Sequence, residues 1–156
     1  MSRVVVIGVG NRYRRDDGAG PAVLDALAHT GAARRARLVE LDGEPARVVE
    51  AWTGADVAFV VDAVRTAGAA AGTVHRIEEP DSGELADGAG RAAGSHALGI
   101  GSAAALGRAL GRLPERLVVF GITGDDFGHG EQVSAPVAVA VAAVAAQVAA
   151  EVEAAG

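Results

Sequence analysis

The chain has 156 residues, half of them apolar, with no cysteine and a formal net charge of −6 at pH 7. This length is most simply a single domain, residues 1–156, and it is large enough to bury a core without disulfides. The acidic balance argues against nucleic acid as a partner, because a phosphate backbone requires a basic face. The apolar run after Met1, Ser2 and Arg3 is too short for a signal peptide, so we expect a cytoplasmic protein.

The stretch Arg3–Gly20, RVVVIGVGNRYRRDDGAG, is the most informative part of the sequence. Its apolar run, Val4–Ile7, predicts a strand covered on both faces, as in a parallel sheet. A glycine loop and two adjacent carboxylates, Asp16 and Asp17, follow the run. Open α/β sheets build their sites in the loops after such strands, so we expect polar chemistry here.

Alternating helical and strand patterns continue through the first half of the chain. A helix is predicted from about Asp17 to His29 and ends at a glycine, and Ala36–Leu41 alternates with charge like a strand near a sheet edge. Pro45–Trp52 is predicted to be a short helix. The third strand, Val57–Val61, runs straight into Asp62. A carboxylate directly after five apolar positions indicates a functional residue.

The second half repeats the alternation. Thr73–Ile77 is predicted to be a peripheral strand, and Glu79–Gly94 lacks periodicity and is predicted to be a loop that leads to His96. Leu98–Leu110 is predicted to be a helix with Leu110 facing inward, and Leu117–Ile122 to be the last buried strand.

The C-terminal stretch 133–150 carries no charge and is about long enough to span a bilayer. It is mainly alanine, which transfers poorly into lipid. Its valines recur at helical spacing and form one stripe: Val137, Val141, Val144, Val148 and Val152. We predict a core helix capped by Ser134, and no membrane association.

Strands and helices therefore mostly alternate. This pattern predicts an α/β fold, a three-layer sandwich in which a twisted, mostly parallel five-stranded sheet lies between helices. In such a sheet Asp17, Asp62 and His96 would all lie beyond the carboxyl ends of strands. Two carboxylates and an imidazole can bind a divalent metal and leave a position open for water or substrate.

Simpler structural roles are open for the same residues. Asp17 could equally cap its helix, where a carboxylate gains roughly 0.3–1 kcal/mol. His96 alone could be a histidine at a helix start that faces solvent. Asp62 is harder to explain structurally, because burying an unpaired carboxylate is costly.

Other polar residues are predicted to be peripheral. His29, His75 and His129 are expected on the surface, and Asp125 and Asp126 in a turn.

The glycine loop also resembles a nucleotide site, but its details disagree. The dinucleotide fingerprint requires a third glycine where this sequence has Tyr13, and no P-loop lysine follows. Nucleotide binding is therefore a minor alternative.

Four segments together resemble the hydrogenase maturation proteases: GVGNRYRRDDGAG from Gly8, VVDAV at Asp62, SHALGI around His96, and VVFGITG. The resemblance covers nearly the whole chain in the same order. Proteins of this family are endopeptidases that trim a C-terminal extension from the large-subunit precursor of nickel–iron hydrogenases.

The resemblance implies that Asp17, Asp62 and His96 contact nickel already mounted in the precursor, and that zinc or cadmium can occupy the same site. Nickel would polarise the scissile carbonyl or acidify a water molecule, or Asp17 or Asp62 would act as general base. A monomer is also implied. One departure is that Asp42 and Gly43 are followed by Glu44 and Pro45, where many relatives have glycine and threonine.

Two other function classes are open at this stage. Peptidyl-tRNA hydrolases open with a similar strand and GxGN loop, but they need a histidine–asparagine pair and a basic surface that this chain lacks. A non-enzymatic nickel-sensing or nucleotide-binding module is the third hypothesis.

Overall fold

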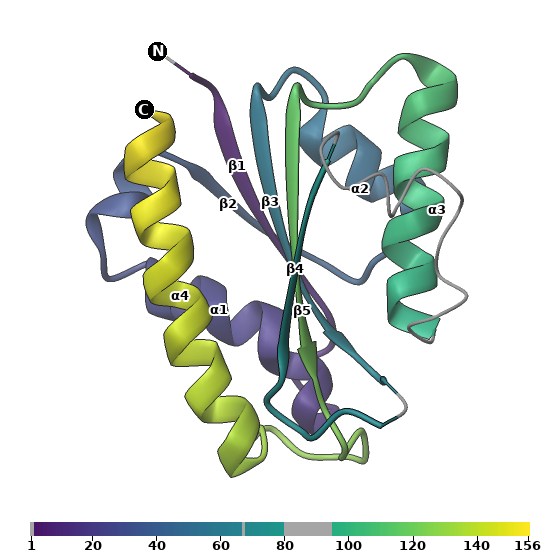
Figure 1. The fold of residues 1–156 in the computed structure, drawn as a ribbon, viewed down its shortest axis with the longest axis vertical. Coiled ribbons are helices and arrows are strands. Elements are labelled where there is room, and N and C mark those ends of the chain that lie inside the picture. Colours follow the sequence, from purple (N-terminus) through teal and green to yellow (C-terminus); the bar gives the residue numbers. More distant parts are fainter. Residues whose placement is uncertain (1, 67, 80–94) are drawn as a thin grey trace.

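The computed structural model describes residues 2–66, 68–79 and 95–156, and the side chains of residues 95–99 are not part of that description. A single sheet lies between two helical layers (Figure 1). Its strands are β1 Val4–Val9, β2 Arg37–Leu41, β3 Val57–Val64, β4 Val74–Glu79 and β5 Arg116–Thr123. The helices are η1 Arg15–Gly18, α1 Ala19–Leu27, η2 Gly31–Arg34, α2 Pro45–Trp52, α3 Ser95–Leu110 and α4 Ala135–Ala155.

The strand order is β2-β1-β3-β5-β4. The first four of these strands are mutually parallel, and β4 pairs with β5 in the antiparallel sense. This confirms the predicted α/β sandwich with a mostly parallel five-stranded sheet, and it places β2 and β4 at the edges as expected. The carboxyl ends of the four parallel strands therefore meet at one end of the sheet.

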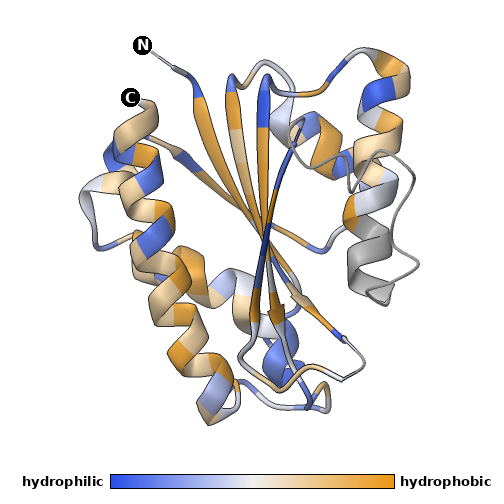
Figure 2. Ribbon diagram, viewed as in Figure 1, coloured by the Kyte–Doolittle hydropathy of each residue, from blue (hydrophilic) through white to orange (hydrophobic). Residues whose placement is uncertain are grey.

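The core has two layers because successive residues of each strand point to opposite faces. One layer joins the sheet to α1 and α4, and the other joins it to α2 and α3. Figure 2 shows the central strands as hydrophobic along most of their length. Aromatic side chains fill both layers: Phe59 and Phe120 lie under α4, and buried Trp52 donates its indole N–H to Arg112 O at 2.8 Å.

Helix α4 presents its predicted valine stripe to the core. All five valines of the stripe, Val137 to Val152, are buried. By length and composition α4 is also apolar enough to cross a membrane, a test that core helices pass as well. Its packing against the sheet and α1 identifies it as a core helix.

Several element boundaries differ from the sequence predictions. The third strand continues to Val64, so Asp62 lies inside it rather than after it. The first α-helix starts at Ala19 rather than at Asp17, and the 3-10 helix η1 precedes it. Gly31 opens the 3-10 helix η2 instead of closing a helix.

The region around His96 also differs. Helix α3 begins at Ser95, so His96 belongs to its first turn. The prediction that Leu110 faces inward is wrong, since Leu110 is 54% exposed at the last turn of α3. Glu79 ends β4, and the rest of the predicted loop, residues 80–94, lies outside the described residues.

Glycines allow the first loop and α1 to lie directly against the strands. A Cβ added at Gly20 would come 2.5 Å from Val9 O and 2.6 Å from Val61 O. A Cβ at Gly8 would come 2.7 Å from Gly20 O. These contacts involve backbone atoms, which cannot move aside as a flexible side chain can. Helix α1 can therefore start close above β1 and β3 only because Gly8 and Gly20 lack side chains.

The substitution Gly20→Ala should destabilise the fold by about 1–3 kcal/mol or more, the usual cost of overpacking a filled interior. Gly31→Ala is the matched control, because its Cβ would come no closer than 3.8 Å to Glu153 Oε1. Urea unfolding monitored by circular dichroism measures both. Equal midpoints for the two variants would contradict the close-packing explanation.

Candidate functional site at the carboxyl ends of the strands

Asp62 is a buried carboxylate in the middle of the sheet. It is 2% exposed and lies near the end of β3, paired with Val9 of β1 on one side and Gly121 of β5 on the other. Directly paired residues point to the same face of a sheet. Val9 belongs to the core layer under α2 and α3, so Asp62 also faces that layer.

Asp17 reaches the same end of the sheet from the loop after β1. It lies in η1, is 8% exposed, and accepts a hydrogen bond at Oδ2 from Asn11 N at 3.0 Å. The loop can close in this way because Gly10 has φ +142°, and a Cβ there would lie 1.9 Å from Asp17 O. The alternative that Asp17 caps the following helix is wrong: the N-cap of α1 is Gly18, and no side chain caps it.

The third predicted ligand is described only in part. His96 lies in the first turn of α3, and Figure 1 shows that α3 starts at the end of the molecule where the parallel strands finish. Its side chain is outside the described residues. Among the side chains that are described, no group of three His, Cys, Asp or Glu residues is arranged to hold a metal ion. The structure thus brings Asp17 and Asp62 to one end of the sheet, and the three-residue metal site stays a prediction.

Sequence reasoning missed the role of Asp16, which is completely buried beside Asp17. Its Oδ1 accepts from Ser134 N at 2.6 Å, and its Oδ2 accepts from Asp125 N at 3.0 Å, Asp126 N at 3.1 Å and Ser134 Oγ at 3.0 Å. Asp16 N also donates to Asp126 O at 2.9 Å. One side chain therefore joins the loop after β1 to the loop after β5 and to the start of α4.

These bonds hold the Asp16 carboxylate in its charged form. Burial, the largest single influence, acts to raise the Asp16 pKa, but the hydrogen bonds from the backbone of Ser134, Asp125 and Asp126 and from the Ser134 hydroxyl outweigh it. The pKa of Asp16 consequently lies below the ordinary aspartate value. Ser134 occupies the N-cap position of α4, as expected, but its side chain makes no capping bond because the hydroxyl donates to Asp16.

Arg12 fixes the outer part of the loop. Its guanidinium contacts Asp25 of α1 at 2.7 Å and Glu40 of β2 at 2.7 Å. The hydrogen bonds with Asp25, and then those with Glu40, raise the Arg12 pKa. These groups are well exposed, so the pairs add little stability, but they fix the loop relative to two elements. Beside Arg12 lies a cavity of about 310 Å³, lined by Gly10, Asn11, Arg12, Tyr13, Glu40, Leu41, Asp42 and Arg47.

One histidine lies closer to the site than predicted. His29 and His129 are exposed as expected, but His75 is half-buried, with Nε2 3.4 Å from Oγ1 of buried Thr123. It pairs with Gly121, which pairs with Asp62 on its other side. His75 and Asp62 therefore lie in one row on the same face, separated by a residue without a side chain. The hydrophobic pattern of single strands cannot predict this row, because the row depends on the register of β3 and β4 against β5.

Solved structures show the same architecture. The hydrogenase maturating endopeptidase HybD from E. coli matches with a TM-score of 0.78 at 21% identity, over 99% of this chain and 94% of that one. The [NiFe] hydrogenase maturation protease HybD from Thermococcus kodakarensis matches with a TM-score of 0.75 at 21% identity, over 96% and 97% of the two chains. The fold is that of the hydrogenase maturation proteases.

A hydrogenase 3 maturation protease matches less closely in shape, with a TM-score of 0.62 at 24% identity over 93% of this chain and 88% of that one. No family model and no curated protein sequence matches the chain. At identities this low the likeness establishes the fold, and the activity has to be inferred from the site.

Replacing Asp16 with Asn should lower the free energy of unfolding by about 1–3 kcal/mol at pH 7, because an amide NH₂ would face N–H donors that now have an acceptor. The folded-state pKa of Asp16 is lowered. Its contribution is therefore fully present above the unfolded-state pKa of about 3.9 and is lost as pH falls through the folded-state pKa. Denaturant unfolding across this pH range measures the effect.

Asp125→Asn is the matched control, since the Asp125 side chain is exposed and only its backbone N–H bonds to Asp16. The difference in stability between Asp16→Asn and the parent chain should shrink as the solution is acidified. A difference that stays constant down to the lowest pH would show that the charge of Asp16 is not what stabilises the three joined segments.

Proposed function

We propose that this chain is an endopeptidase that removes the C-terminal extension of a nickel-loaded large-subunit precursor of a nickel–iron hydrogenase. The observation that carries the proposal is the pair of buried carboxylates, Asp17 and Asp62, at the carboxyl ends of adjacent strands in a maturation-protease fold. A cytoplasmic monomer that meets its precursor in solution fits this role.

The donor chemistry fits a metal carried in by the substrate. Asp17 and Asp62 are buried carboxylates at the same end of the sheet, and carboxylate oxygens are ligands for the positive charge of a divalent metal ion. A nickel ion mounted in the precursor would supply that charge and would polarise the scissile carbonyl or acidify a water molecule. Cleavage would then depend on metal insertion, because an unloaded precursor would bring no ion to the carboxylates. His96, in the first turn of α3, is the proposed third ligand.

The chain's own groups would position the ion and a proton acceptor. Asn11 N holds one oxygen of Asp17, which fixes the direction of that carboxylate. Asp62 is held by strand pairing on both sides, so its position is set by the sheet itself. Either carboxylate could act as general base toward water. Asp62 in the strand and Asp17 in the loop, hydrogen-bonded to Asn11 N, therefore form a preorganised pair.

The cavity beside Arg12 is the proposed place for the peptide next to the scissile bond. It lies between the loop after β1 and the turn after β2, where Asp42 and Gly43 precede α2. Tyr13 at its margin is 63% exposed and offers an aromatic surface to a substrate chain. At the start of α2, next to this turn, Glu44 caps the helix by accepting from Ala46 N and Arg47 N.

Neither alternative function has comparable support. The structures that match include maturation proteases, and the net charge of −6 does not favour a tRNA substrate. A nickel-sensing module would bind metal but would not cut a precursor.

The deciding experiment incubates the chain with hydrogenase large-subunit precursor, with and without nickel loading, and measures the product mass. Nickel-dependent loss of a short C-terminal peptide is expected. A loaded precursor that stays intact, while the chain itself binds nickel, would favour the sensing module instead.

Asp62→Asn and Asp17→Asn should each reduce processing by at least about 100-fold, the usual scale for a general base, while the far-ultraviolet circular dichroism stays unchanged. His96→Ala should have a similar effect. Asp125→Asn changes the charge equally at an exposed position and should retain full activity. Wild-type rates in a folded Asp17→Asn, Asp62→Asn double variant would exclude the proposed site.

A further inference from the structure

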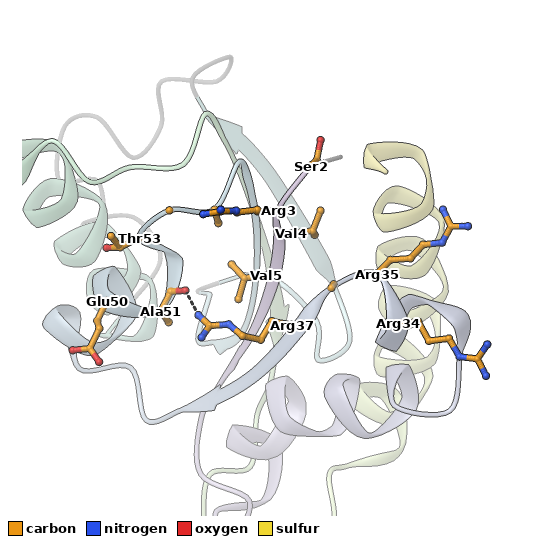
Figure 3. A pocket seen from close by; sticks show the side chains of 13 residues that line it. Ser2, Arg3, Val4, Val5, Arg34, Arg35, Arg37, Glu50, Ala51 and Thr53 are labelled. Carbon is orange, nitrogen blue, oxygen red and sulfur yellow. Dashed lines mark hydrogen bonds between the residues drawn. The ribbon is translucent and has the colours of Figure 1, made fainter.

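A second cavity, of about 520 Å³, lies at the opposite end of the sheet (Figure 3). The starts of β1 and β2, the segment that joins η2 to β2, and the end of α2 surround it. Its lining includes four arginines: Arg3, Arg34, Arg35 and Arg37. The whole chain carries a net charge of −6, so its composition gives no reason for cations to gather at one place.

Several arginines elsewhere in the described structure are paired with acidic side chains. Arg12, Arg76 and Arg116 each form ion pairs with carboxylates. Within the same described ranges, none of the four guanidinium groups at the cavity forms an ion pair with a carboxylate. Like charges gathered in one place repel one another, and an anionic ligand would reduce that cost.

Two of the four side chains reach into the cavity together. Arg37 pairs with Val5, and Arg3, which directly precedes β1, lies two residues before Val5, so both arginines point to the same face of the sheet. Arg37 Nη2 donates to Ala51 O at 2.6 Å, and Nη1 of Arg3 lies 3.9 Å from where a Cβ of Gly54 would be. The guanidinium of Arg37 therefore bonds to the last turn of α2, and that of Arg3 lies near Gly54, two residues after the helix ends.

The other charged residues point elsewhere. Figure 3 shows Arg34 and Arg35 directed to the opposite side of β2 and Glu50 directed away from both inner guanidinium groups. The carbonyl of Ala51, at the partly negative end of α2, already accepts a hydrogen bond from Arg37. The inner part of the cavity therefore presents mainly N–H donors and positive charge.

We propose that this cavity binds a small polyanion that carries two phosphate or carboxylate groups, one at Arg3 and one at Arg37. A guanidinium has five N–H donors, so Arg37 retains donors after bonding to Ala51 and can form charge-assisted hydrogen bonds to an anion. The cavity volume lies in the range of small-molecule sites, about 300–1,000 Å³. Arg34 and Arg35 add positive potential at the rim. This site is separate from the proposed peptidase site and does not depend on that function.

Isothermal titration calorimetry with pyrophosphate and with citrate, at constant ionic strength, tests the proposal. Saturable binding of one anion per chain is expected with the parent protein. Arg3→Gln and Arg37→Gln should each weaken binding at least about tenfold, the scale of a hydrogen bond between charged groups. Arg34→Gln and Arg35→Gln should have smaller effects because their side chains point away.

Arg112→Gln is the matched control, because it removes one exposed positive charge outside the cavity. Arg37→Gln also loses its bond to Ala51, so circular dichroism must show that it is folded. Arg3→Gln keeps its backbone bond to Asp56 and tests the site independently.

Non-saturable binding of both anions, or equal weakening by Arg112→Gln and Arg3→Gln, would overturn the proposal. Binding of an acidic peptide when neither small anion binds would also overturn it and would assign the surface to a protein partner. No hydrogenase precursor is used, so this result is independent of the peptidase test.

Discussion

The arrangement of the candidate site depends on the buried carboxylate of Asp16. It collects donors from the loop after β5 and from the start of α4, and it belongs to the same short helix, η1, as Asp17. The buried Asp16 carboxylate is stable in its charged form because these donors direct hydrogen bonds at its two oxygens. Asp17 is consequently presented from a loop that is fixed on two sides, by the Asp16 bonds and by the Arg12 contacts with Asp25 and Glu40.

The two ends of the sheet have different chemistry for the same structural reason. A parallel sheet places all strand starts at one end and all strand ends at the other, so loops with different sequences gather separately. Carboxylates gather at the strand ends, where Asp16, Asp17 and Asp62 are buried. Arginines gather at the strand starts, where Arg3 and Arg37 line the second cavity. A metal-bearing substrate and a small anion would therefore bind at separate places.

The sequence was sufficient to predict the layers, the strand count and the edge positions of β2 and β4, because hydrophobic periodicity reports which faces are buried. It also identified Asp62, since a carboxylate in an apolar strand has few structural explanations. The separate roles of Asp16 and Asp17 could not be predicted, because they depend on contacts with Ser134, more than a hundred residues away. The row from Asp62 through Gly121 to His75 was hidden for a similar reason, since strand register is set by tertiary pairing.

The central claim is that Asp17 and Asp62 bind one metal ion. Its most direct test is anomalous diffraction at the cadmium edge from crystals of the chain soaked with cadmium. An anomalous peak shared by the carboxylates of Asp17 and Asp62 is predicted, and it should disappear in Asp62→Asn crystals. Peaks confined to exposed carboxylates such as Asp125 and Asp126, with none at Asp62, would contradict the account.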